Sequence, residues 1–324
     1  MSLRLGTDFS GIDAPLQALR NLGVCVEYLF ASEIAADVRE HVRLHGSPDR
    51  LYDDVTTRDH TELPHVDLYV AGFPCQSFSL RGAHRGTSEP RGLLVQHSLA
   101  YIRHARPRVV VFENVPGLLT PRHRALLDET VTAMRSMGYS VDHRVLSARD
   151  FGCPQNRKRL FIVGIHGVAT VPWPVAADAD STVLLEAAFA AGSGGKRVTL
   201  AERSTPRYEA LISSYRTQQK AKGHDATRLA IFDMSRATAC VCRPGTAPCI
   251  TSGGNAHRLL WSTGDSYVWA NVHHVLALQG FPPDYPLHGM SESRMRVAVG
   301  NSMVIGVMAA LFANLLPFCA DRKD

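Results

Sequence analysis

The sequence predicts an α/β protein with a doubly wound parallel sheet and a second, smaller domain. Between residues 3 and 165, short apolar runs that close on Gly, Pro, Asp or Glu alternate with helical patterns. This alternation is typical of a parallel sheet covered by helices. From Val168 to Thr263 it stops, and Ala/Asp runs, a Gly-Ser-Gly-Gly segment and scattered basic residues take its place. We expect that stretch to form the smaller, irregular domain.

The elements of the larger domain can be placed in chain order. Short apolar runs predict strands at Leu3–Phe9, Val24–Ala31, Leu68–Ala71, Arg108–Phe112, Tyr139–Leu146 and Leu160–Ile165. Helical patterns predict helices at Leu16–Leu22, Ala35–Leu44, Gly92–His104, Ala125–Met137 and, packing back on the sheet, Val297–Leu316. Asp13 is a favourable N-cap residue and Pro15 suits a first turn, so the first helix is expected to begin there. A turn is expected at Leu51–Thr56.

Composition limits the kinds of protein this chain can be. Its 324 residues are 45% hydrophobic and 20% charged, as in soluble globular proteins. It has no apolar run of the ~18 residues that a membrane helix needs, and its first residues lead directly into a strand, so no signal peptide is expected. The seven cysteines include no Cys-x-x-Cys pair. Reduced thiols in the cytoplasm and no metal site are therefore expected.

Basic residues are concentrated in one segment. Lys196 to Leu260 holds eleven Lys and Arg against four Asp and Glu, a local excess of +7 in a chain whose net charge is +5. Such an excess indicates a polyanionic partner. Charge alone favours a solvated basic surface equally well.

Three polar clusters adjoin predicted strands. Pro74-Cys75-Gln76 follows the strand at Leu68–Ala71, Glu113-Asn114-Val115 follows Arg108–Phe112, and Gln155-Asn-Arg157-Lys-Arg159 precedes Leu160–Ile165. The carboxyl ends of parallel strands share one edge, so the first two clusters are expected together, whereas the third could lie elsewhere. A thiol, an acid and two guanidinium groups could then meet one planar substrate. The alternatives are a core cysteine, a structurally paired glutamate and two surface arginines.

These clusters, in this order, resemble the DNA cytosine-5 methyltransferases, in particular the compact prokaryotic restriction–modification type. The resemblance extends to Asp8-Phe9-Ser10-Gly11, Glu33, Asp54-Val55-Thr56, Arg91-Gly92-Leu93-Leu94, Leu278-Gln279-Gly280-Phe281-Pro282 and Gly300-Asn301-Ser302. It covers nearly the whole chain except about Val168 to Asp265. The chain departs from the family at Asp13, where a glycine is usual. It departs again at Trp269–His274, where the family usually carries an Arg, a Thr and a Glu.

The resemblance implies a Rossmann-like, S-adenosylmethionine-dependent catalytic domain at 1–168 plus 285–324, and a target-recognition domain and hinge at 169–284. It implies methyl transfer to C5 of a flipped-out cytosine in a specific duplex DNA sequence. Cys75 would add to C6 of the ring and make C5 nucleophilic. Glu113 would bind N3 and the exocyclic amine, Arg159 would bind O2, and Arg157 would brace the catalytic loop.

The resemblance also assigns binding residues. Phe9 would lie against the adenine of S-adenosyl-L-methionine, Glu33 would bind the ribose hydroxyls, and Asp54 would accept from the adenine amine. The remaining cofactor positions are Ser10, Gly11, Ile12, Ile34, Val55, Pro74, Leu94, Asn301 and Ser302. DNA contacts are expected from Gln76, Ser79, Arg81, Thr251, Ser252, Gly253, Gly254 and Arg258. Asp13 is expected to turn away from the cofactor and cap the first helix, with a grip on the cofactor's ammonium group as the alternative.

The expected partner is double-stranded DNA, bound by a monomer in the cytoplasm or on the nucleoid, with no membrane and no metal. The recognition sequence, and whether a companion restriction endonuclease exists, stay open. Two alternatives remain. One is an RNA (tRNA) cytosine-5 methyltransferase of the same fold, although the Cys-Phe-Thr signature that would mark that branch is absent. The other is a catalytically inactive DNA-binding regulator.

Overall fold

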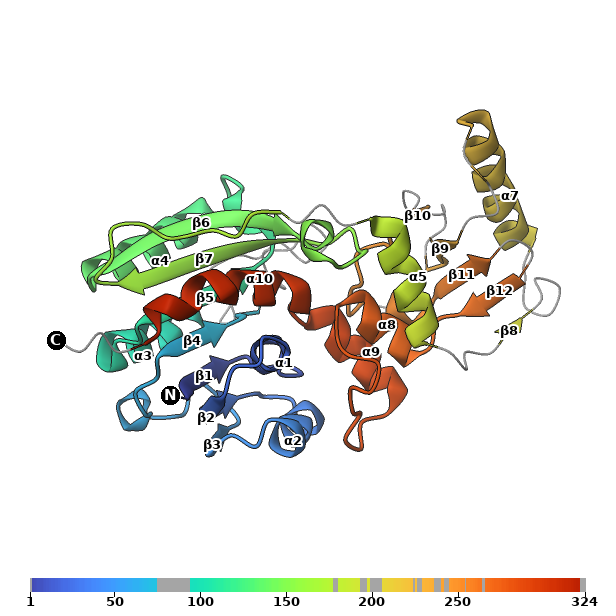
Figure 1. The fold of residues 1–324 in the computed structure, drawn as a ribbon. Helices are drawn as coiled ribbons and strands as arrows, with labels where there is room; N and C mark the ends of the chain where they lie inside the picture. The colour runs from blue at the N-terminus through green and yellow to red at the C-terminus, as the bar shows by residue number, and fades with distance from the viewer. Residues whose placement is uncertain are drawn as a thin grey trace. The chain divides into compact units, whose positions relative to one another are not determined.

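A computed structural model of the chain describes residues 2–74, 94–176, 180–192, 197–198, 206–223, 225, 229–235, 240–241, 245–253, 255–263 and 266–320 (Figure 1). The chain divides into two compact units. Unit 1 comprises Met1–Leu146, Lys158–Val175 and Val307–Asp324, and unit 2 comprises Ser147–Arg157 and Ala176–Gly306. Residues 147–157 and 285–306, which the sequence assigns to the catalytic domain, therefore pack within unit 2. The functional roles of the two domains stay a prediction.

Unit 1 is built on a seven-stranded sheet with the order β3-β2-β1-β4-β5-β7-β6 (Figure 1). Its strands are β1 (Leu3–Asp8), β2 (Val26–Ser32), β3 (Arg50–Tyr52), β4 (Leu68–Ala71), β5 (Val109–Asn114), β6 (Tyr139–Ser147) and β7 (Lys158–His166). The pairs from β3 through β5 are parallel, which confirms the predicted fold class, but β7 pairs with β5 in antiparallel fashion. The expected turn at Leu51–Thr56 begins with the short edge strand β3.

The helices of this unit follow the predicted order. They are α1 (Ala14–Asn21), α2 (Ala36–His45), α3 (Val95–Ala105) and α4 (Arg124–Ser136), with 3-10 turns at His60–Glu62 and Pro116–Leu119. An aromatic group forms the middle of the core, where the Tyr101 ring of α3 lies 5.1 Å from that of Phe30 and 4.8 Å from that of Tyr69. A Cβ at Gly6 would lie 2.3 Å from the Phe30 ring. Glycine at that position of β1 is therefore required for the ring to pack over the strand.

Unit 2 contains a five-stranded sheet that the sequence analysis did not predict. Its order is β10-β9-β11-β12-β8, and its described pairs are antiparallel. The strands are β8 (Arg197–Val198), β9 (Ala230–Asp233), β10 (Cys240–Val241), β11 (Leu259–Thr263) and β12 (Ser266–Trp269). Helix α7 (Pro206–Ala221) packs on this sheet through Tyr215, whose ring lies 5.3 Å from that of Phe232. The irregular domain of the sequence analysis is thus corrected to a small α/β layer.

The remaining helices include a second correction. They are α5 (Ser181–Ala191), α8 (Val272–Leu278), α9 (Glu292–Asn301) and α10 (Ile305–Leu315), with 3-10 turns at Ala148–Phe151, Asn255–His257 and Leu316–Phe318. The single helix expected at Val297–Leu316 is broken, because Ser302 adopts an extended conformation with φ −70° and ψ 156°. Among the described residues no single helix is long and apolar enough to cross a membrane, and α9 with Ile305–Phe318 meets that test only as a pair bent by 45°.

Candidate active site

The reversed direction of β7 brings the Glu113 cluster and the Lys158–Arg159 end of the third cluster to one edge of the unit 1 sheet. In the parallel part of the sheet Ala71 lies beside Phe112, so the segment after β4 and the end of β5 share that edge. In the antiparallel pair Glu113 lies beside Phe161 and Asn114 beside Leu160. The first residues of β7 therefore meet the last residues of β5. Antiparallel pairing therefore places Arg159, at the end of the third cluster, on the same edge as Glu113, a placement that the sequence left open.

Glu113 and Arg159 form an ion pair at this edge. The Nε of Arg159 lies 3.1 Å from Oε1 of Glu113, and their side chains are 17% and 10% exposed. Because both are mostly removed from water, the pair is oriented more firmly than a surface ion pair would be. An acid and a guanidinium, both groups that can hydrogen-bond a planar substrate, are thus held side by side at this edge.

Asn114 ties the segment before Cys75 to β5. Its Nδ2 donates to the carbonyl of Phe73 at 3.4 Å, and its Oδ1 accepts from the N–H of Val115 at 2.8 Å. Phe73 is buried and Pro74 half-buried. Asn114 therefore has a structural role and sets the direction in which the chain leaves β4. Four predicted site residues of the next segment lie outside the described residues: Cys75, Gln76, Ser79 and Arg81.

Arg157 belongs to unit 2 and is only 2% exposed. Its NH1 donates to the carbonyls of Ile250 at 2.7 Å and Gly300 at 3.2 Å, and its NH2 donates to the carbonyl of Ser302 at 2.6 Å. Its guanidinium thus binds backbone on two chain segments. The predicted contact of Arg157 with the catalytic loop stays a prediction.

The predicted cofactor loop has an unusual backbone. Phe9, Gly11 and Asp13 all have φ near +55°, in the left-handed region. Glu33 fixes this loop, since its carboxylate accepts from the N–H of Gly11 at 3.0 Å and of Ala35 at 2.9 Å. Burial raises the pKa of Glu33, and these two backbone hydrogen bonds partly offset that effect. The loop and the end of β2 therefore form one rigid edge, within which Ser10 and Ile12 are buried.

Ile34 and the segment that carries Asp54 complete this edge in unit 1. Ile34 is 72% exposed, which is unusual for so large an apolar side chain. Asp54 accepts from the N–H of Thr56 at 2.8 Å, and this hydrogen bond lowers its pKa. Val55 beside it is buried. Leu94 lies at the N-terminus of α3, and its predicted contact with cofactor stays untested.

A buried ion pair that sequence reasoning missed anchors the Asp54 segment. The Arg58 guanidinium binds the carboxylate of Asp8 at the end of β1 and also donates to Ser32 at the end of β2. The Arg58 and Asp8 side chains are 2% and 0% exposed, and the hydroxyl of Tyr69 donates to the same carboxylate. The available signal was an acid at the end of an apolar strand, which needs a buried partner.

Asp13 corrects a prediction. It occupies the N-cap position of α1, but its side chain makes no cap hydrogen bond. Instead it is fully buried, accepts from the Tyr28 hydroxyl at 2.8 Å through Oδ1, and has Oδ2 without a partner among the described residues. A Cβ at Gly46 would lie 2.5 Å from that Oδ2. The positive φ of 55° directs the carboxyl away from the helix N-terminus, so the expected cap is wrong. The expected orientation of Asp13 away from the cofactor stays a prediction.

Burial raises the pKa of Asp13 from 3.8 to about 7, which makes the stability of the protein depend on pH. Between these values the folded state binds the extra proton, so unfolding becomes easier as pH rises towards 7. We expect wild type to lose about 2 kcal/mol relative to Asp13→Asn between pH 5.5 and 8.5. Denaturant titrations of both proteins at the two pH values check this. A difference that is independent of pH would contradict it.

The predicted DNA-contacting residues that the structure describes lie in unit 2. Thr251 and Ser252 are half-buried, while Gly253 and Arg258 are exposed. Gly254 falls outside the described part of the chain. The predicted cofactor residues Asn301 and Ser302 also lie in this unit, with Asn301 exposed and Ser302 buried. Their roles stay predictions.

The departure at Trp269–His274 proves to be a helix cap. The Asn271 side chain accepts from the N–H of His274 at 3.0 Å, and Nδ1 of His274 accepts from the N–H of Asn271 at 3.1 Å. Asn271 also donates to the carbonyl of Gly192 at 3.0 Å. Burial lowers the pKa of His274 to about 4, so the ring is neutral and can accept. This reciprocal cap starts α8 and braces it against the end of α5.

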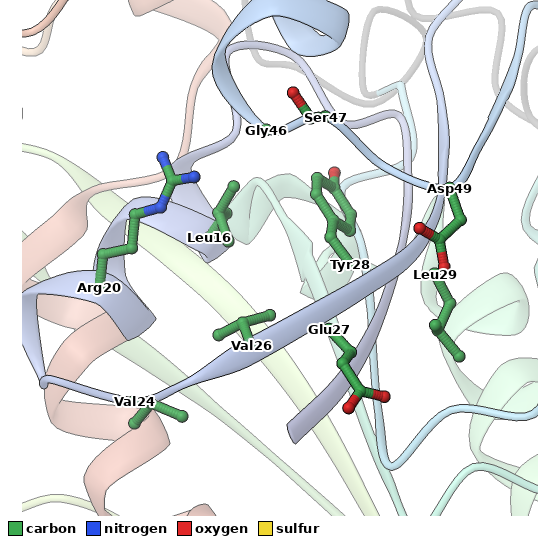
Figure 2. A pocket seen from close by; sticks show the side chains of 10 residues that line it. All are labelled: Leu16, Arg20, Val24, Val26, Glu27, Tyr28, Leu29, Gly46, Ser47 and Asp49. Atoms are coloured by element: carbon green, nitrogen blue, oxygen red, sulfur yellow. The ribbon is translucent and has the colours of Figure 1, made fainter. Parts of the chain in front are cut away.

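A cavity of about 400 Å³ in unit 1 lies at the amino end of β2, away from the strand ends that carry Glu33 and Glu113. Figure 2 shows the Tyr28 ring with Leu16 of α1 to its left and the Gly46–Ser47 turn above it. We do not assign the active site to this cavity, because the predicted site residues Glu33, Glu113 and Arg159 do not line it. Across the described ranges no group of three or more His, Cys, Asp or Glu side chains could hold a metal ion.

Comparison with known proteins adds an independent observation. The family model of C-5 cytosine-specific DNA methylases matches residues 8–232. The chain belongs to this family. The match includes Cys75, Glu113, Arg157 and Arg159, and the resemblance stated from the motifs is therefore confirmed.

Relatives within the C-5 cytosine-specific DNA methylase family come from phages and prokaryotes. The chain is 39% identical over 166 residues to the orphan methyltransferase M.SPRI of Bacillus phage SPR, a match covering 51% of this chain and 38% of that protein. It is 26% identical over 255 residues to the type II methyltransferase M.MthTI of Methanothermobacter thermautotrophicus, covering 76% and 77%. The match to the phage protein thus spans little more than a third of its length.

Solved structures support the fold. The S. pombe Dnmt2 methyltransferase superposes with a TM-score of 0.63 at 19% identity, covering 97% of this chain and 99% of that one. A putative DNA modification methyltransferase from an E. coli prophage superposes with a TM-score of 0.64 at 17% identity, covering 97% and 100%. At these identities the likeness concerns the fold, which is the Rossmann-like fold predicted from the sequence.

Proposed function

We propose that the chain methylates C5 of a cytosine in a specific duplex DNA sequence, with S-adenosyl-L-methionine as the methyl donor. One observation carries the proposal. In a chain of the C-5 cytosine-specific DNA methylase family, the Glu113–Arg159 pair lies at the sheet edge where the segment leading to Cys75 leaves β4. An acid, a guanidinium and a thiol are the groups that a covalent attack on a cytosine ring requires.

Cys75 is the proposed nucleophile. A thiolate that adds to C6 breaks the aromaticity of cytosine and makes C5 nucleophilic, so the ring can take up a methyl group there. Loss of the C5 proton and expulsion of the thiolate then restore the ring. A thiol with the usual pKa near 8.5 is mostly protonated at neutral pH, and neighbouring positive charge favours the thiolate.

Glu113 and Arg159 are the proposed substrate-binding groups. The Glu113 carboxyl hydrogen-bonds N3 and the exocyclic amine, and the guanidinium of Arg159 donates to O2. Their mutual ion pair at 3.1 Å holds both groups in one orientation before the base arrives. Preorganised groups of this kind stabilise the charge that develops on the ring during attack at C6.

The edge in unit 1 fits the adenosine part of S-adenosyl-L-methionine. A Cβ at Gly11 would meet no described atom within 4 Å, so the loop backbone is open there. Each Glu33 oxygen already accepts one backbone N–H and can accept a ribose hydroxyl as well. Exposed Ile34 offers apolar contact to the adenine. When bound, the cofactor supplies an electrophilic methyl group on its sulfonium.

Target recognition is proposed for residues 169–284, and catalysis for 1–168 with 285–324. A base within a duplex must leave the stack before Cys75 can reach it, at a cost of a few kcal/mol. We assign stabilisation of that state to the loop with Gln76, Ser79 and Arg81. The proposed enzyme acts as a monomer in the cytoplasm, and a companion restriction endonuclease would be a separate protein.

DNA binding should depend steeply on salt because the segment from Lys196 to Leu260 has an excess of +7. The logarithm of the affinity should fall by about 0.9 per phosphate contact for each tenfold rise in salt. Arg258→Ala, at an exposed basic position of this segment, should reduce that slope by about 1. Fluorescence anisotropy with a labelled duplex measures both values.

The matched control is Arg103→Ala, which removes an exposed arginine from the last turn of α3 in unit 1. Its slope should equal that of wild type. An affinity that is independent of salt, or equal slopes for both variants, would remove the basic segment from the DNA interface.

A methyl-transfer assay separates the proposed function from its alternatives. Tritiated methyl groups from S-adenosylmethionine should appear in duplex DNA and not in tRNA, and bisulfite sequencing should place them on one cytosine of a defined sequence. Transfer to tRNA alone would establish an RNA methyltransferase. Binding of DNA without any transfer would establish a regulator.

A further inference from the structure

Three buried polar side chains of unit 2, which we call the Gln155–Arg157–Gln279 cluster, share backbone partners. Gln155 and Arg157 both bind the backbone of Ile250, and Gln279 and Arg157 both bind the carbonyl of Ser302. Gln155 and Gln279 are 0% exposed and Arg157 is 2% exposed. Nε2 of Gln155 donates to Oε1 of Gln279 at 2.8 Å. Buried polar groups cost stability unless they are satisfied, so such a cluster persists only where its hydrogen bonds are nearly complete.

On one side the cluster holds the backbone that leads into Thr251 and Ser252, two of the predicted DNA-contacting residues. Oε1 of Gln155 accepts from the N–H of Ile250 at 2.9 Å, and NH1 of Arg157 donates to the carbonyl of the same residue at 2.7 Å. The backbone of Ala247 pairs with the chain around Gln155, through hydrogen bonds of 2.6 and 2.8 Å. The exposed end of this segment is Gly253.

On the other side the same side chains hold the end of α9. Nε2 of Gln279 donates to the carbonyl of Val299 at 2.7 Å and to that of Ser302 at 3.3 Å. Arg157 donates to the carbonyls of Gly300 and Ser302. These bonds coincide with the break between α9 and α10, and they leave Asn301 exposed. Asn301 and Ser302, which the resemblance assigns to the cofactor, therefore lie on the other side of the cluster from Ile250.

The two arms also touch directly. A Cβ at Gly300 would lie 2.5 Å from the backbone N of Ser252 and 2.5 Å from the carbonyl carbon of Thr251. Only a glycine allows the end of α9 to approach the recognition segment this closely. A shift of Thr251 and Ser252 upon DNA binding must therefore move the end of α9 or break shared hydrogen bonds, because packed elements do not deform continuously.

We infer that the Gln155–Arg157–Gln279 cluster couples DNA binding to cofactor binding. This inference rests on the proposed function of the chain. Gln155 and Gln279 are then positioning residues, which act through the backbone of residues 250–252 and 299–302 and touch neither ligand. The coupling is reciprocal, so DNA raises cofactor affinity by the same factor by which cofactor raises DNA affinity.

The coupling factor is measured by calorimetric titration of S-adenosylhomocysteine with and without a short duplex that carries the site found by bisulfite sequencing. In wild type the duplex should tighten binding by about fivefold or more, within the usual range of such couplings. Gln279→Met keeps the volume but removes the hydrogen bonds to Val299 and Ser302. In this variant the factor should fall below about twofold, while each ligand still binds alone.

Two further variants keep the test decisive. Arg157→Lys retains the charge but cannot bind the carbonyls of Ile250 and Ser302 in the same bidentate way, so it should also lower the factor. Asn271→Ala removes hydrogen bonds elsewhere in unit 2 and should reduce thermal stability without changing the factor. If Gln279→Met does not fold, Arg157→Lys carries the comparison with Asn271→Ala.

A wild-type coupling factor near one, or an unchanged factor in folded Gln279→Met and Arg157→Lys, would overturn the inference while leaving methyl transfer intact. A wild type that transfers no methyl to DNA would instead overturn the proposed function, and the coupling of these two ligands with it. The methyl-transfer assay run on the same preparations distinguishes the two failures.

Discussion

Replacing Cys75 with serine is expected to reduce methyl transfer by about 10⁴-fold or more, because the thiolate that adds to C6 is lost. Binding of DNA should survive, since the basic segment is unchanged. Wild type should also form an adduct that resists denaturation with duplexes carrying 5-fluorocytosine at the target. The fluorine cannot leave from C5 as the proton does, so the thiolate stays attached. Radiolabelled transfer and denaturing gels measure the two effects.

The matched control is Cys25→Ser, which changes an exposed free thiol in unit 1. It should retain wild-type activity and adduct formation. Methylation by Cys75→Ser near the wild-type rate, or an equal loss of activity in Cys75→Ser and Cys25→Ser, would contradict the covalent mechanism. The Glu113–Arg159 pair would then need another role.

The second large effect concerns stability. Arg58→Met should destabilise the protein by about 3–5 kcal/mol, because it leaves the Asp8 carboxylate buried without its cation. The double variant Asp8→Leu/Arg58→Met should recover more than half of this loss, since two apolar side chains can replace a buried ion pair at little cost. Denaturant titrations of the single and double variants form the cycle that measures the interaction.

Arg124→Met serves as the surface control. Arg124 pairs with Asp128 at 2.9 Å on α4, with both side chains about half exposed at 48% and 57%. Its removal should change stability very little. A similar loss in Arg58→Met and Arg124→Met would show that burial of the Asp8–Arg58 pair has no energetic consequence.

The parts of the site that the sequence predicted are those that local pattern determines. Short apolar runs ending in polar residues placed Glu113 and the approach to Cys75 at one sheet edge. Periodicity does not encode strand direction, so the antiparallel β7 that brings Arg159 to Glu113 could not be foreseen. Family resemblance supplied the pairing instead, by naming both residues as contacts of one base.

The sequence analysis missed other features because they depend on residues that are far apart in the chain. Arg58 and Asp8 are 50 residues apart, and no local rule links them. Strands β8 and β10 have only two residues each, which is too short to show an alternation of apolar and polar side chains in the sequence. Asp13 has the residue type of a helix cap, yet its backbone conformation directs the carboxyl elsewhere. Residue type predicted the position of α1 but not the orientation of that side chain.

The division of unit 1 into three chain segments affects how the protein emerges from the ribosome. The sheet of unit 1 includes β7, which follows the unit 2 segment Ser147–Arg157. The last segment of unit 1, Val307–Asp324, follows the unit 2 segment Ala176–Gly306. Unit 2 therefore lies between parts of unit 1 in the order of synthesis. Domains usually fold as units during translation. Unit 1 is complete only when its last segment has been made, after the whole of unit 2. A nascent chain stalled before residue 307 lacks the buried side chains Met308, Leu311 and Phe312 of α10, so the apolar surface that they bury in the finished protein should be open to chaperones.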